Sequence, residues 1–153
     1  MKENKKTMHI LMADDDDDDR RTFAKAWKAA RAVNPIHFVN DGEELMDYLY
    51  KRGKYADSAE WKLPGLILLD LNMPKKDGRE ALREIKDDPE LRIIPVVVLT
   101  TSKAEEDIYR TYDLGANSFI TKPVTFTSMV ELVLIIGKYW IEIVETPSTL
   151  IGE

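Results

Sequence analysis

The stretch MHILMADDDDDD (8–19) joins an apolar hexamer directly to a run of six aspartates. A second apolar run, LILL (66–69), also ends in an acid, Asp70. In an open parallel α/β sheet the C-termini of the strands share one edge, and ligand sites form there. We therefore expect Asp14, Asp15 and Asp70 to meet in one crevice, where like charges raise each other's pKa unless a cation neutralises them. The pattern predicts a site for a divalent cation that prefers oxygen ligands, such as Mg²⁺.

The composition is typical of one soluble globular domain. The chain has 153 residues, of which 44% are hydrophobic and 33% charged, enough for a full core. A net charge of −6 argues against a nucleic-acid partner, because phosphate backbones attract lysine and arginine. Without cysteine there are no disulfides. No signal peptide is evident and no apolar run approaches the ~20 residues of a membrane span, so we predict a cytoplasmic protein without membrane association.

Short apolar runs alternate five times with segments of helical periodicity. Strands are predicted over Met8–Ala13, Ile36–Asn40, Leu66–Asp70, Ile94–Thr100 and Ser118–Thr121. Helices are predicted over Asp17–Ala32, Gly42–Lys51, Lys76–Asp87, Ala104–Leu114 and Phe126–Glu145. This alternation implies βαβ crossovers, and hence an α/β fold with a five-stranded parallel sheet, doubly wound as (βα)5.

The domain organisation is simple. We expect residues 1–6 to form a disordered N-terminus, residues 7–145 to fold as one domain, and residues 146–153 to form a C-terminal tail. The segment Gly53–Gly65 is longer than a usual αβ connection. We interpret it as a surface excursion that Trp61 anchors.

Polar residues follow two further strands. Thr100 ends the predicted fourth strand, and Lys122 follows the fifth, directly before Pro123. A carboxylate can attack phosphorus and form an aspartyl phosphate. A magnesium ion, an ammonium group and a hydroxyl can then hold the phosphoryl oxygens, so that little is needed beyond positioning and charge neutralisation.

Four motifs, taken together and in order, resemble the receiver domain of two-component response regulators. They are ILMADD (10–15), LLDLNMPKKDG (68–78), PVVVLTT (95–101) and FITKP (119–123). The resemblance implies a flavodoxin-like receiver fold and a single-domain regulator with no DNA-binding or enzymatic output domain. It further implies that a sensor histidine kinase or histidine phosphotransfer protein donates a phosphoryl group, and that the output is protein–protein contact rather than enzymatic turnover. In carrying the pair Tyr139-Trp140 and Pro147, the chain resembles stand-alone regulators that partner phytochrome-type histidine kinases.

The same resemblance implies roles for the acidic residues. Asp70 would be the phosphoacceptor. Asp15 would bind Mg²⁺ directly, and Asp14 directly or through water. The main-chain carbonyl of Asn72 would complete the ligands that the protein supplies.

The resemblance also implies how the signal is formed. Thr100 would hydrogen-bond the phosphoryl group and Lys122 would pair with it, next to a cis Lys122–Pro123 bond. Phe119 occupies the position of the switch aromatic, and it would turn inward when Thr100 moves toward the phosphoryl group.

Several alternatives stay open. Asp16 to Asp19 suit the N-terminus of a helix, so we interpret them as capping residues. Thr101 is the second candidate for the role of Thr100. A phosphatase of the haloacid dehalogenase type also uses an aspartate nucleophile with Mg²⁺, but it needs a second acid where this chain has Asn72. A flavin-binding module is disfavoured, because aspartates stand where a flavin phosphate needs hydrogen-bond donors.

The last predicted helix, Phe126–Glu145, has two neighbouring apolar faces where a helix on one sheet needs a single stripe. The surplus predicts a partner surface, and we expect a homodimer through the fourth helix, fifth strand and fifth helix. The alternative is that the tail, 146–153, folds back and covers these side chains.

Overall fold

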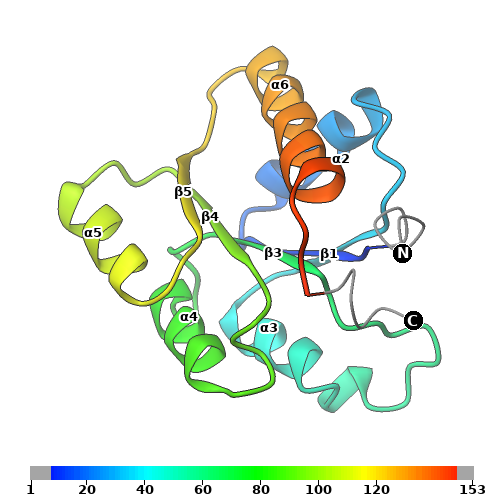
Figure 1. Ribbon diagram of the computed structural model, residues 1–153, viewed down its shortest axis with the longest axis vertical. Helices are drawn as coiled ribbons and strands as arrows, with labels where there is room; N and C mark the ends of the chain where they lie inside the picture. The colour runs from blue at the N-terminus through cyan, green and yellow to red at the C-terminus, as the bar shows by residue number, and fades with distance from the viewer. Residues whose placement is uncertain (1–7, 148–153) are drawn as a thin grey trace.

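The computed structural model describes residues 8–147 and shows one parallel sheet between two layers of helices (Figure 1). The five strands are arranged in the order β2-β1-β3-β4-β5, and all neighbours are parallel. Their bounds are β1 Ile10–Ala13, β2 Ile36–Val39, β3 Leu66–Leu69, β4 Val96–Thr100 and β5 Ser118–Thr121. The predicted α/β fold is therefore confirmed, with β2 and β5 at the two edges of the sheet.

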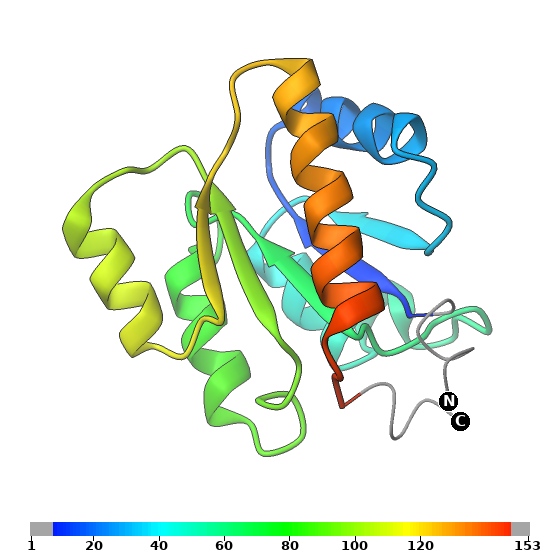
Figure 2. The ribbon, with the colours of Figure 1, turned by 45° about the horizontal axis from the view of Figure 1, so that its top comes forward.

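The helices divide between the two faces of the sheet (Figure 2). One face carries α2 Asp17–Ala29 and α6 Phe126–Ile136, and the other carries α3 Gly42–Leu49, α4 Gly78–Asp87 and α5 Glu105–Asp113. A short 3-10 helix, η1 Gly53–Tyr55, follows α3, and a π-helix, η2 Gly137–Ile143, continues α6. Each predicted helix and strand is present, with ends that differ by a few residues except at the last helix.

Alternation along the central strands builds two separate cores. In β3, Ile67 and Leu69 pack with α3 and α4, whereas Leu66 and Leu68 pack with α2 and α6. All four side chains are fully buried, as expected for a parallel strand covered on both faces. Because the strand period is two, Asp70 continues on the α2–α6 side of the sheet.

The last helix is the main departure from the sequence prediction. A continuous α-helix over Phe126–Glu145 is wrong, because Gly137–Ile143 forms a π-helix, in which the amide of Val144 donates to the carbonyl of Tyr139 at 2.9 Å. The wider turn of a π-helix rotates the side chains that follow it. Ile141 is buried as a result, while Trp140, which the α-helical spacing assigned to the main apolar face, lies only at the edge of the core.

Trp61 anchors the long segment after α3, as predicted. Its indole nitrogen donates to the carbonyl of Tyr48 at 2.8 Å, and its ring packs against the core on that side of the sheet. The Tyr48 hydroxyl donates to the carbonyl of Lys62 at 3.0 Å. The two bonds fasten the excursion to α3 on the side of the molecule away from β5.

Further predictions concern the peptide bond before Pro123, the two ends of the chain and membrane-spanning helices. The prediction of a cis Lys122–Pro123 peptide bond is wrong, because no peptide bond within residues 8–147 is cis. The trans form of a bond before proline is the more stable by about 0.5–1 kcal/mol. The predicted disordered N-terminus (1–6) lies outside the described residues, and so does most of the predicted tail. No described helix combines the length and hydropathy that crossing a bilayer requires.

Candidate phosphoryl and metal site

Asp14 and Asp70 continue two neighbouring strands at the C-terminal edge of the sheet. The amide of Asp14 donates to Val39 at 3.1 Å, and the amide of Asp70 donates to Ala13 at 3.0 Å. These backbone bonds extend the ladder by one residue beyond each strand, so the position of both carboxylates is set by the sheet itself. Both residues are buried, whereas Asp15, the second residue after β1, is exposed.

The three acids meet, as the sequence predicts. Asp14, Asp15 and Asp70 each present a carboxylate oxygen, and these oxygens all lie within 4.8 Å of one another. Carboxylate oxygens are the ligands that Mg²⁺ and other hard divalent cations prefer. The donor set and its compactness therefore fit a divalent metal ion.

Lys122 reaches into the same cluster from the end of β5. Its ammonium lies 2.7 Å from Asp14, 2.7 Å from Asp19 and 3.1 Å from Asp70. The side chain is only 6% exposed, and the backbone amide of Lys122 is held by the carbonyl of Thr100 at 2.8 Å. Lys122 thus ties β5 and β4 to the acids at the ends of β1 and β3.

The electrostatics of the cluster are dominated by burial and by the single ammonium group. Burial raises the pKa of Asp14, and the hydrogen bond from Lys122 offsets only part of that rise. Burial alone would lower the pKa of Lys122, but the hydrogen bonds to Asp14 and Asp19 outweigh it and hold the pKa above its ordinary value. One cation therefore faces several carboxylates, and the excess negative charge favours a divalent ion.

Asp19 is a site residue that sequence reasoning missed. Asp16 does cap α2, as predicted, accepting from the amides of Asp18 and Asp19 at 2.8 and 3.0 Å. Asp19, however, directs its carboxylate to Lys122. The available signal was its spacing of four residues from Phe23, which is fully buried. Residues four apart share a helix face, so Asp19 lies on the face of α2 that is turned to the sheet.

Thr100 is the better placed of the two candidate threonines. It is fully buried, whereas Thr101 is exposed. Within residues 8–147, its hydroxyl is the buried side-chain polar atom that lacks a hydrogen-bond partner. A buried hydroxyl left unpaired costs about 1–3 kcal/mol. It is therefore a donor available to an oxygen-rich group at this edge of the sheet.

Phe119 and Asn72 are placed, but their roles stay predictions. Phe119 pairs with Val98 in the sheet and, by strand alternation, shares a face with Thr100. Its ring is partly buried against the core on the side of α3 to α5. The amide of Asn72 donates to Asp70 at 3.4 Å, which places the residue beside the cluster without testing its carbonyl as a ligand.

The chain is similar to known proteins over most of its length. Residues 10–134 match the family model described as the response regulator receiver domain. Response regulator Rcp1 of Synechocystis is 40% identical over 139 residues, covering 91% of this chain and 92% of Rcp1. The probable methanogenesis regulatory protein FilR2 of Methanothrix harundinacea is 36% identical over 132 residues, covering 86% of this chain and 83% of FilR2.

Solved structures give the same result. The phosphorylated cyanobacterial phytochrome response regulator RcpA is 42% identical with a TM-score of 0.85, covering 93% of this chain and 99% of RcpA. The Mn²⁺-bound form of Rcp1 is 40% identical with a TM-score of 0.82, covering 92% of this chain and 99% of that structure.

These similarities support neither the phosphatase nor the flavin-binding alternative. The family signals through phosphorylation in two-component systems, which implies contact with histidine kinases or phosphotransfer proteins. The cluster of Asp14, Asp15 and Asp70 suggests a divalent metal, in keeping with the Mn²⁺ bound to Rcp1. On its fold, its site and its relatives, this chain belongs to the response regulator receiver family.

Proposed function

We propose that Asp70 accepts a phosphoryl group from a sensor histidine kinase or a histidine phosphotransfer protein. A carboxylate oxygen of Asp70 attacks phosphorus while the bond from phosphorus to the donor's imidazole nitrogen breaks. The observation that carries this proposal is the position of the Asp70 carboxylate, 3.1 Å from the Lys122 ammonium and within the compact acid cluster. Among residues 8–147, the buried carboxylates are those of Asp14 and Asp70, and both contact the Lys122 ammonium.

The neighbouring residues have distinct roles in this proposal. Lys122 pairs with a phosphoryl oxygen, and the free hydroxyl of Thr100 donates to another. Mg²⁺, held by Asp14, Asp15, Asp70 and the carbonyl of Asn72, would neutralise the carboxylates and the phosphoryl oxygens. Asp19 keeps Lys122 directed at the pocket.

Magnesium is expected to stabilise the protein. A ligand that binds the folded and not the unfolded chain adds about 2.7 kcal/mol to the free energy of unfolding at 100 times its dissociation constant. For a chain of this size, that gain raises the melting temperature by about 5–10 °C. Thermal denaturation with and without MgCl₂ measures the effect. Asp70→Asn should weaken the response, since it removes one charged ligand. An unchanged melting temperature for the wild type would rule out the magnesium site.

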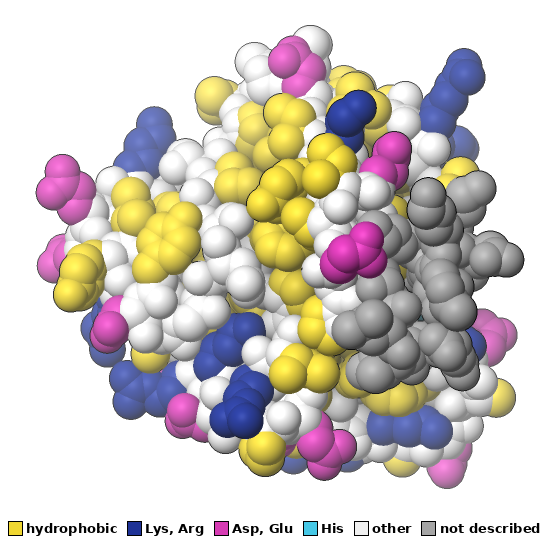
Figure 3. Space-filling view, viewed as in Figure 1, with side chains coloured by type: hydrophobic (Ala, Val, Ile, Leu, Met, Phe, Trp, Pro, Cys, Tyr) yellow, Lys and Arg dark blue, Asp and Glu magenta, His cyan; other side chains and the backbone are white. Residues whose placement is uncertain are grey.

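We also propose that phosphorylation promotes a homodimer through α5, β5 and α6. Apolar side chains are exposed along α6 and η2, among them Leu134 at 52%, Ile135 at 63% and Ile143 at 56%. Figure 3 shows yellow side chains gathered over this part of the molecule. On α5, Tyr109 and Tyr112 are exposed as well. An exposed apolar patch like the one over α6 and η2 is typical of an interaction site.

Beryllofluoride, a mimic of the phosphoryl group, is expected to shift the oligomeric state in the presence of Mg²⁺. Light scattering should report a dimer for the wild type. For Ile135→Glu the affinity of self-association should fall by at least about tenfold, because a charge buried in an apolar interface loses its hydration. Val33→Glu, at a residue 79% exposed outside this surface, is the matched control. Equal scattering with and without beryllofluoride would contradict the dimer switch.

The cytoplasmic location and the lack of a nucleic-acid partner stay predictions from composition. The part of Phe119 in the switch also stays a prediction, which rests on the resemblance to receiver domains.

A further inference from the structure

An ion-pair network joins the first turns of α4 and α5, outside the acid cluster. The Arg79 guanidinium contacts one carboxylate oxygen of Asp107, with Nη2 at 2.9 Å and Nε at 3.2 Å. Its Nη1 lies 3.2 Å from both carboxylate oxygens of Asp77. The Ser102 hydroxyl donates to the second oxygen of Asp107 at 2.6 Å. We name these four residues the α4–α5 latch.

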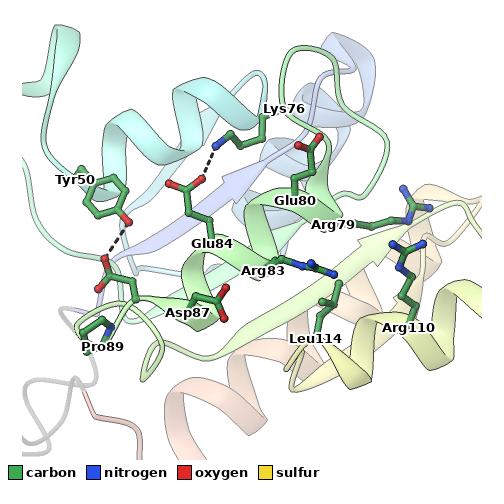
Figure 4. Close-up of a pocket in the computed structure, with 11 residues that line it drawn as sticks. Tyr50, Lys76, Arg79, Glu80, Arg83, Glu84, Asp87, Pro89, Arg110 and Leu114 are labelled. Atoms are coloured by element: carbon green, nitrogen blue, oxygen red, sulfur yellow. Dashed lines mark hydrogen bonds and ion pairs between the residues drawn. The ribbon is translucent and has the colours of Figure 1, made fainter.

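The latch is sheltered enough to matter energetically. The side chains of Arg79 and Asp107 are each only 22% exposed, so their charges are less screened than those of a surface pair. The hydrogen bond from Ser102 and the pairing with Arg79 hold the pKa of Asp107 below its ordinary value. Arg79 also lines a groove of about 750 Å³ that runs along α4, with Tyr50 on one side and Arg110 on the other. In Figure 4 the side chain of Arg79 extends from α4 on the side of Arg110.

One end of the latch is attached to the segment that follows the phosphoacceptor. Asp77 caps α4 by accepting from the amide of Arg79 at 2.8 Å. The amide of Gly78 donates to the carbonyl of Leu71 at 2.8 Å, so the start of α4 is bonded to the residue directly after Asp70. The position of Arg79 is therefore coupled to the phosphoacceptor loop.

The other end is attached to the loop that follows Thr100. Ser102 lies two residues after Thr100, and Asp107 lies in the first turn of α5. The bond from Ser102 to Asp107 therefore joins the start of the β4–α5 connection to the first turn of α5. A displacement of Thr100 that carries Ser102 with it, while α5 stays in place, would stretch or break the bond from Ser102 to Asp107.

We propose that the α4–α5 latch holds the loop after Thr100 in its unphosphorylated position, which makes Arg79 a positioning residue for the phosphoryl switch. This inference rests on the proposed phosphorylation of Asp70. Because the unpaired hydroxyl of Thr100 has to approach the phosphoryl group, the latch bonds favour the state seen here and oppose the active one. Weakening the latch raises the population that binds a phosphoryl mimic.

The test measures the affinity for beryllofluoride at saturating Mg²⁺ by ¹⁹F NMR. Asp107→Asn keeps the shape and the acceptor for Ser102 but removes the charge that pairs with Arg79. Arg79→Gln removes the charge of the partner on α4, and so breaks the same ion pair. Both variants should bind beryllofluoride about fivefold more tightly than the wild type, because a larger fraction is already competent. Arg79→Lys, which keeps the charge, should restore part of the wild-type affinity.

Two further readouts separate positioning from general destabilisation. Magnesium affinity without beryllofluoride should stay within about twofold of the wild type, since no latch residue belongs to the acid cluster. Amide hydrogen exchange in residues 101–104 should accelerate in both variants. Arg52→Gln is the matched control. It breaks the pair between Arg52 and Asp47 of α3, whose atoms lie 2.7 Å apart, and it should leave beryllofluoride affinity unchanged.

Unchanged or weaker beryllofluoride binding by folded Asp107→Asn would overturn the latch. If that variant is unstable, Ser102→Ala, which alters a residue outside the helices, decides the question by the same affinity measurement. A wild-type protein that binds no beryllofluoride would instead refute the phosphoryl site, and the latch proposal would fall with it. Normal wild-type binding with no change in the variants refutes the latch alone.

Discussion

Asp70→Asn is expected to reduce phosphoryl acceptance by at least about 100-fold, because an amide oxygen is a far weaker nucleophile than a carboxylate. The substitution preserves the shape of the side chain, and the backbone bond from residue 70 to Ala13 is kept. The variant should therefore fold and still present Lys122 and Thr100 to the pocket. Incubation with acetyl phosphate and Mg²⁺, followed by mass spectrometry of the intact protein, measures the yield of phosphoprotein.

Asp18→Asn is the matched control for this experiment. Asp18 belongs to the same aspartate run, but its side chain is 89% exposed and pairs with Arg21 at 2.8 Å. Its substitution should leave the yield of phosphoprotein within about twofold of the wild type, since exposed ion pairs contribute little. Full phosphorylation of Asp70→Asn would show that another acid is the phosphoacceptor, and Asp14 and Asp15 would be the next candidates.

Gly78→Ala is expected to destabilise the protein strongly, although it adds a single methyl group. A Cβ at this position would lie 2.3 Å from the carbonyl oxygen of Asp70 and 2.7 Å from the Cα of Leu71. Both neighbours are backbone atoms, so no side-chain rotation can relieve the clash. Forced overpacking of this kind costs about 3 kcal/mol, which lowers the melting temperature by about 6–12 °C. Thermal denaturation measures the change.

The same clash predicts a functional effect. Relief requires α4 to move away from the phosphoacceptor loop, so Asp70 should lose its alignment with Lys122 and phosphorylation should slow. Gly137→Ala is the control, because a Cβ there would meet no atom within 4 Å. Alanine at an unstrained helical glycine stabilises by about 0.4–1 kcal/mol. Equal melting temperatures for the two variants would show that the approach of α4 to Asp70 is not tight.

Much of the fold and of the acid cluster could be predicted from the sequence. The alternation of apolar runs and helical segments predicted all five strands, because a buried parallel strand needs apolar residues on both faces. Strand ends in such a sheet lie at one edge, so placing Asp14 and Asp70 at two strand ends was enough to bring them together. The position of Lys122 followed from its resemblance to the receiver motif.

Contacts made by helices could not be predicted in the same way. The sequence favours a capping role for Asp19, yet its carboxylate lies 2.7 Å from the Lys122 ammonium. The α-helical spacing predicts that Trp140 lies on the main apolar face, whereas the π-helix buries Ile141 and leaves Trp140 at the edge of the core. The latch between Arg79 and Asp107 joins residues with no shared motif.

The difference has a physical reason. A strand's partners are set by backbone hydrogen bonds that repeat with a period of two, so the pattern of residues along β1 and β3 alone determined where Asp14, Asp15 and Asp70 would lie. A helix is free to rotate and shift on the sheet until its side chains pack. Only the tertiary structure, by seating α2 over β1 and α5 beside α4, decided that Asp19 enters the pocket and that Arg79 meets Asp107.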